Sequence, residues 1–179
     1  MMSTEELENK AETTLLETDT YRVPIHIHIV AQRLNLTLEA LPLGKISGML
    51  IVRGDRGAIG YNSAHARVRQ RSTISHEVAH FALHSNQNAK PKLFIDEQIM
   101  SRVGKVASGK SERQEAEAYR LGSALLMPKS LVQKEIRNRD LDLDDDEAIN
   151  FLAKQFWVSP VAIAIRLSRL GILLYAACY

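Results

Sequence analysis

The chain has 179 residues, of which 45% are hydrophobic and 25% are charged, and its formal net charge is +2. This length and composition predict one globular domain, or one domain with a small appendage, that can bury a core without disulfide cross-links. The small net charge argues against wholesale binding to nucleic acid.

The sequence has no feature of a secreted or membrane-spanning chain. Its first ten residues, MMSTEELENK, lack the basic region and apolar run of a secretory signal. No apolar stretch approaches the ~20 residues that cross a bilayer. The single cysteine, Cys178, cannot form an internal disulfide, which is typical of a reducing compartment. We therefore expect a cytoplasmic protein without membrane contact.

The N-terminal part predicts two helices followed by short strands. Residues 3–17 are polar and rich in Glu and predict a loose helix, and Pro24 fits the first position of a helix that runs to about Leu34. Strands are expected at residues 37–41, 48–53 and 58–61. The Gly-Asp-Arg-Gly turn between the last two predicts a hairpin. We expect a small, mostly antiparallel, three-stranded sheet.

The next helix is expected to begin near residue 70 or 72 and to end at His84. One side of it is apolar and predicts contact with the core. The residues on this side are Ile74, Val78, Phe81 and Ala82. The opposite side carries histidines and is expected to face a cleft. His84 lies a further turn along, which makes it a rim residue rather than a ligand.

The pattern HExxH occupies residues 76–80 of this helix. His76 and His80 are four residues apart, so both imidazoles lie on one face and can reach one metal ion. Two imidazole nitrogens suit Zn²⁺, which prefers tetrahedral coordination. Glu77 lies about 100° around the helix from His76, where it can accept a proton from a metal-bound water rather than ligate the metal. The alternative is an ordinary amphipathic helix with surface histidines.

A second helix supplies a candidate third ligand. Residues 85–110 are expected to be mostly loop with a strand at 93–95, and a helix then begins at Ser111 as N-cap and stops before Pro128.

The inward face of that helix carries Glu115 together with small and apolar residues, and a buried carboxylate needs a partner such as zinc. Glu112 is the fallback ligand, and Glu117, about 200° away, is expected to face solvent. The alternative for Glu115 is a solvated acidic helix start.

The C-terminal part predicts three more helices, at residues 129–138, 147–156 and 160–170. The acidic residues 140–146 are expected to cap the second of these. We expect residues 1–138 to form the main domain, and residues 139–179 to form a helix-turn-helix-like appendage packed on it or a continuation of the same domain.

The chain resembles the ImmA/IrrE family of zinc metallopeptidases over about residues 20–174. The matching segments are Gly48 in KISGMLI, Asn62, RVRQRSTISHEVAHFALH, EAEAYRLGSALLMP and LAKQFWVSPVAIAIRLSRLGIL. The resemblance implies that Glu115 is the third zinc ligand. The chain departs from the family pattern at two places after Glu115. Tyr119 stands where family members have Asn or Asp, and Leu121-Gly122 stands where they have Phe-Ala. The resemblance also implies a protein substrate. This substrate would be a helix-turn-helix (Xre-type) repressor, and its loss would derepress mobile-element or stress-response genes.

These observations predict an α+β, zincin-like zinc endopeptidase. His76, His80 and Glu115 would hold Zn²⁺, and Glu77 would be the general base. The group that stabilises the oxyanion is unassigned. The candidates are Tyr119, Tyr61 and His65.

Two alternatives lack peptidase turnover. One is a DNA-binding regulator, because residues 147–170 read as helix-turn-helix with Lys154, Arg166 and Arg169 nearby. The second of those helices is largely apolar and has few groups for base edges, so direct binding to nucleic acid is not expected. The other is a zinc-binding sensor. The sequence leaves the oligomeric state open.

Overall fold

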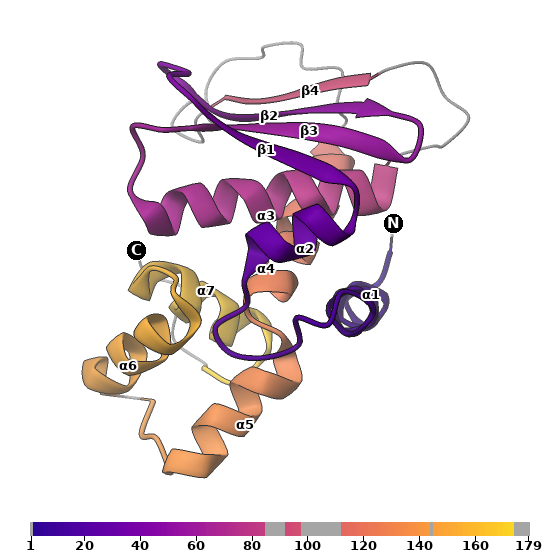
Figure 1. Ribbon diagram of the computed structural model, residues 1–179. Helices are drawn as coiled ribbons and strands as arrows, with labels where there is room; N and C mark the ends of the chain where they lie inside the picture. The colour runs from indigo at the N-terminus through magenta and orange to yellow at the C-terminus, as the bar shows by residue number, and fades with distance from the viewer. Residues whose placement is uncertain (1, 85–91, 98–111, 144, 174–179) are drawn as a thin grey trace.

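The computed structural model describes residues 2–84, 92–97, 112–143 and 145–173. Three strands follow one another and the helices come in runs, which defines an α+β fold, as expected. In chain order the elements are α1 (Thr4–Glu17), α2 (Ile27–Arg33), β1 (Leu36–Leu41), β2 (Ile46–Arg53), β3 (Arg56–Asn62), α3 (Arg67–His84), β4 (Lys92–Glu97), α4 (Glu112–Leu126), α5 (Lys129–Arg139), α6 (Asp146–Phe156) and α7 (Pro160–Arg169). Figure 1 shows the sheet lying over α3, with α5, α6 and α7 at the end of the molecule remote from the sheet.

The sheet has four strands in the order β1-β3-β2-β4. The expected hairpin is present, since β2 and β3 pair antiparallel around a two-residue turn at Gly54-Asp55. Gly54 has a φ of +64°, which glycine adopts without steric cost. β4 pairs antiparallel with β2, and it is the fourth strand that the predicted three-stranded sheet did not include.

β1 departs from the antiparallel pattern, because it pairs parallel with β3. The chain crosses from β1 to β2 through residues 42–45, and β3 then fills the space between them. Gly44, with a φ of +60°, lies in this crossing. The sheet is therefore mixed, with two antiparallel pairings and one parallel pairing.

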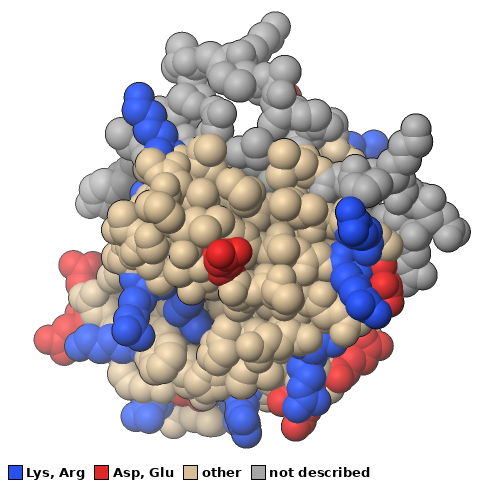
Figure 2. Space-filling model, turned by 45° about the horizontal axis from the view of Figure 1, so that its top comes forward, with Lys and Arg blue, Asp and Glu red and all other residues tan. Residues whose placement is uncertain are grey.

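The two faces of the sheet differ in burial. Leu50 and Ile59 are fully buried on the face toward α3, where Val78 is fully buried as well. On the other face Ile51 and its strand partner Leu93 are 47% and 59% exposed. Figure 2 turns the top of Figure 1 toward the viewer and shows a mostly uncharged face with one acidic side chain near its middle and charged side chains of both signs at its margins. The sheet is thus anchored on α3 by one side only.

Arg166 ties the C-terminal helix to the rest of the molecule. Its side chain is 4% exposed, and its two terminal nitrogens each donate to a carboxylate oxygen of Glu8 at 2.7 Å. Its Nε donates to the Met127 carbonyl at 2.9 Å. α7 is therefore joined to α1 and to the end of α4. The predicted boundary near residue 138 stays a prediction.

Several helix ends differ from expectation by a few residues. α2 begins at Ile27 rather than at Pro24, and α3 begins at Arg67, earlier than residue 70. The acidic segment does cap α6, because the Asp145 carboxylate accepts the Glu147 amide at 2.9 Å. The predicted N-cap Ser111, the loops at 85–91 and 98–110, and Cys178 lie outside the described residues.

Within the described ranges, no individual helix has the length and apolar character to cross a bilayer. By length and composition alone, α6 and α7 pass that test as a pair bent by 101°.

Candidate metal centre

α3 presents the two histidines of the HExxH pattern to one point. The Nε2 atoms of His76 and His80 lie 3.0 Å apart, as their spacing of one helical turn predicts. Ile74, Val78 and Phe81 on the opposite side are buried in the core and fix the orientation of the helix. The histidine face is more enclosed than expected, since the His76 side chain is 15% exposed and that of His80 is 0% exposed.

A close contact between α3 and α4 brings the third side chain to the histidines. The Ser75 hydroxyl donates to the Gly122 carbonyl at 2.7 Å. A Cβ on Gly122 would lie 3.1 Å from the Ser75 carbonyl oxygen and 3.3 Å from the His76 Cα. Glu115 precedes Gly122 by seven residues, which is two turns, and therefore lies on the same face of α4. The absence of a side chain at Gly122 lets the two helices approach.

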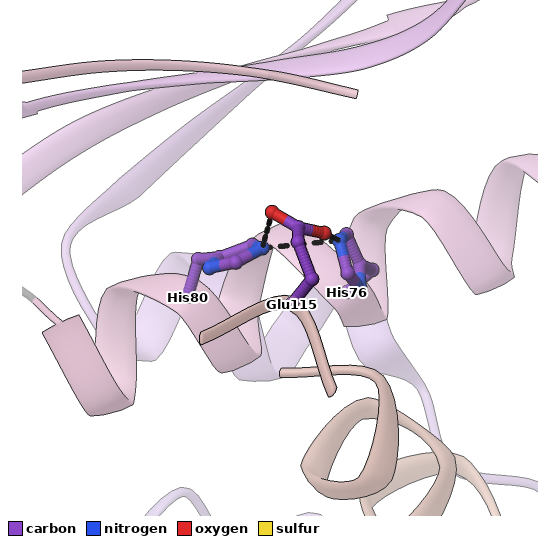
Figure 3. A group of neighbouring side chains, drawn as sticks. All are labelled: His76, His80 and Glu115. Carbon is purple, nitrogen blue, oxygen red and sulfur yellow. Dashed lines mark hydrogen bonds and ion pairs between the residues drawn. The ribbon is translucent and has the colours of Figure 1, made fainter. Parts of the chain in front are cut away.

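The three side chains converge, as Figure 3 shows. Glu115 places one carboxylate oxygen 3.2 Å from the His76 Nε2 and the other 3.3 Å from the His80 Nε2. One donor atom from each residue lies within 4.8 Å of the others. In a tetrahedral zinc site with bonds of about 2.0–2.1 Å, neighbouring donor atoms are about 3.3 Å apart. The distances of 3.0–3.3 Å therefore fit a cation of this size with two imidazoles and one carboxylate.

Glu77 lies in a separate, fully buried position under β2. A Cβ on Gly48 would approach the Glu77 Oε1 to 3.5 Å and the Thr73 Cγ2 to 2.3 Å. Gly48 therefore makes room for α3 against the sheet at the level of Glu77. Tyr61 is the direct antiparallel partner of Gly48, so its side chain is on the same face of the sheet as this space.

We expect Gly48→Ala to destabilise the fold by about 1–3 kcal/mol, because the added methyl would force Thr73 and α3 away from the sheet. Urea unfolding measures this loss. Thr73→Ser removes the clashing methyl, so Gly48→Ala/Thr73→Ser should recover a large part of it. If Gly48→Ala were as stable as the unaltered chain, a steric clash between a Cβ at position 48 and Thr73 would not be the reason for the glycine.

The remaining acidic and oxyanion candidates fall in different places. Glu112 is exposed on the first turn of α4. The prediction for Glu117 is wrong: it is 8% exposed and accepts the Met2 backbone amide at 2.8 Å, because α1 covers that side of α4. Tyr119 is 40% exposed with its ring centroid 4.8 Å from the Arg169 Cζ. His65 lies in the turn before α3.

Asn62 has a structural role that its position in the sequence did not reveal. Its side-chain amide donates to the carbonyls of Gly44 and Ile46, at 3.0 and 2.8 Å, and its Oδ1 accepts the Ala64 amide at 3.0 Å. The residue thereby ties the crossing between β1 and β2 to the turn that leads into α3. The available signal was an Asn placed directly after the strand expected at residues 58–61.

The fold and site define a class of protein. An HExxH helix under a mixed sheet, with a glutamate supplied by a second helix, is the arrangement of a zincin-like metallopeptidase. The model of the IrrE N-terminal-like domain, peptidase family M78, matches residues 25–168, and the chain belongs to this family. α1 precedes the matched residues. No curated protein matches the chain.

Proposed function

We propose that this peptidase is a zinc-dependent endopeptidase in which His76, His80 and Glu115 hold the metal. The observation that carries the proposal is the set of three donor-to-donor distances, 3.0, 3.2 and 3.3 Å, between side chains of two different helices. The donor set of two imidazoles and one carboxylate is that of catalytic zinc sites, in which a fourth position stays open. When bound, zinc would polarise the scissile carbonyl and acidify water.

Glu77 is the proposed general base and general acid. It follows His76 directly on α3, and its carboxylate is fully buried between α3 and β2. In this role it takes a proton from the attacking water and passes it to the leaving amine. Enclosure of the carboxylate keeps bulk water away and strengthens its interaction with a proton donor. Tyr61 is the favoured oxyanion helper, because strand register places it on the same side of the sheet as Glu77.

The proposed substrate is a helix-turn-helix repressor of the Xre type, and its cleavage would derepress mobile-element or stress-response genes. Support comes from the resemblance of the chain to the ImmA/IrrE peptidases, together with membership of the IrrE N-terminal-like family. Such a substrate would place the protein in the cytoplasm.

The direct test is incubation of the full chain with purified candidate repressors, with and without a chelator, followed by mass analysis of the products. Defined fragments that disappear on chelation and return with added zinc are expected. Intact repressors under every condition would remove the substrate proposal. Fragments that persist in chelator would remove the metal-dependent mechanism.

A zinc-binding regulator without turnover is the second candidate. The complete burial of His80 and Glu77 favours it, because a scissile bond must reach the same enclosed space. This candidate predicts zinc uptake with no fragments from any repressor. A DNA-binding role has less support, since Arg166, one of the three basic residues near α6 and α7, is buried against Glu8.

We expect Glu115→Ala to weaken zinc binding at least 100-fold, because it removes one of three ligands and loss of an outer-shell partner alone costs 10–100-fold. Competition with a chromophoric chelator measures the affinity. Glu112→Ala, at an exposed position on the same helix turn, is the matched control and should bind zinc normally. If Glu112→Ala lost zinc and Glu115→Ala kept it, the assignment of the third ligand would pass to Glu112.

A further inference from the structure

A cavity of about 240 Å³ lies where α1, α4 and α7 meet, and it is lined mainly by basic and hydroxyl side chains. Its polar lining residues are Thr4 and Glu8 of α1, Arg120 and Ser123 of α4, and Arg166 and Arg169 of α7. By the helix period, Arg120 and Ser123 lie about 140° and 80° around α4 from Glu115. The cavity is therefore on a different side of α4 from the metal centre.

The charge of the cavity is not balanced by its own walls. Its one carboxylate, Glu8, is occupied by two hydrogen bonds of 2.7 Å from Arg166. Arg169 contacts the ring of Tyr119, and no carboxylate in the described ranges lies within ion-pair distance of Arg169 or Arg120. Two guanidinium groups thus line this cavity without an ion-pair partner among the described residues, while Glu5 and Glu12 line an adjoining cavity that shares Thr4, Glu8 and Arg169.

We propose that this cavity binds a compact phosphate-bearing dianion, such as inorganic phosphate or a small phosphomonoester. Guanidinium forks match phosphate oxygens in pairs, and two of them match the double negative charge. The hydroxyls of Ser123 and Thr4 supply further donors.

The test is calorimetric titration of the full chain with inorganic phosphate and with glycerol phosphate at constant ionic strength. Both probes should bind, and Arg120→Gln/Arg169→Gln should weaken binding at least tenfold. Lys134→Gln/Arg137→Gln removes the same charge from exposed positions on α5 and should bind as the unaltered chain does. Ser123→Asp keeps both arginines but places a carboxylate in the cavity, and it should also abolish binding. Circular dichroism and melting curves verify the fold of each variant.

Titrations with zinc present and with zinc chelated separate this cavity from the metal centre. Binding of the same strength in both states is expected. Binding that requires zinc would assign the anion to the metal centre and overturn the proposal. Equal losses of phosphate affinity in the two double variants would show a general charge effect and overturn the proposal. The absence of binding to the unaltered chain at millimolar phosphate would overturn it as well.

Discussion

Glu77→Gln is expected to lower the rate of substrate cleavage by a factor on the order of 10²–10⁴ while zinc affinity stays unchanged. The amide has nearly the same shape as the carboxylate but cannot accept a proton from water, and general base catalysis contributes a factor of this size. Because Glu77 is absent from the group of converging donor atoms, its replacement leaves that group intact. Cleavage rate and zinc content are measured on the same preparation.

The matched control is Glu112→Gln, which makes the same chemical change at an exposed position. It should cleave at the rate of the unaltered chain. A Glu77→Gln protein that cleaves at that rate would show that another group accepts the proton. A Glu77→Gln protein that loses both cleavage and zinc would show instead that the buried carboxylate supports the metal.

Arg166→Met is expected to lower the free energy of unfolding by about 3–5 kcal/mol, because it leaves the carboxylate of Glu8 without its partner. The Glu8 side chain is 15% exposed, so little water is available to replace the guanidinium. Urea unfolding measures the change.

Replacement of both Glu8 and Arg166 should lower the free energy of unfolding far less than replacement of Arg166 alone. Glu8→Leu/Arg166→Met replaces the ion pair by apolar groups of similar size, and such replacements are often nearly neutral. Arg137→Met, at an exposed position on α5, should change stability by no more than about 0.5 kcal/mol. If the double variant were as unstable as Arg166→Met, the loss would come from the hydrogen bond to Met127 rather than from the unpaired Glu8.

Much of the candidate site could be predicted because helix periodicity acts over short distances. A spacing of four residues is enough to place His76 and His80 on one face of the helix. In the structure their Nε2 atoms lie 3.0 Å apart. The same periodicity turned Glu115 toward the apolar side of its helix, and the structure brings it to both histidines. These predictions needed no knowledge of distant contacts.

The errors arose where contacts far apart in the sequence decide the outcome. Glu117 was expected in solvent because one buried face was assumed for α4, whereas α3 and α1 cover two sides of it. The burial of Arg166 was not predicted, because its partner Glu8 is 158 positions away in the sequence. The parallel pairing of β1 with β3 was missed because turn signals report only neighbouring strands.

The assembly of the donor group from α3 and α4 has a consequence for the lifetime of the protein. The unfolded chain does not hold His80 beside Glu115, so zinc would bind the native state selectively. At a free concentration of 1,000 times Kd, such a ligand adds about 4.1 kcal/mol to the free energy of unfolding. If zinc is the bound metal, as proposed, a chain without it would unfold more often and be degraded sooner by proteases.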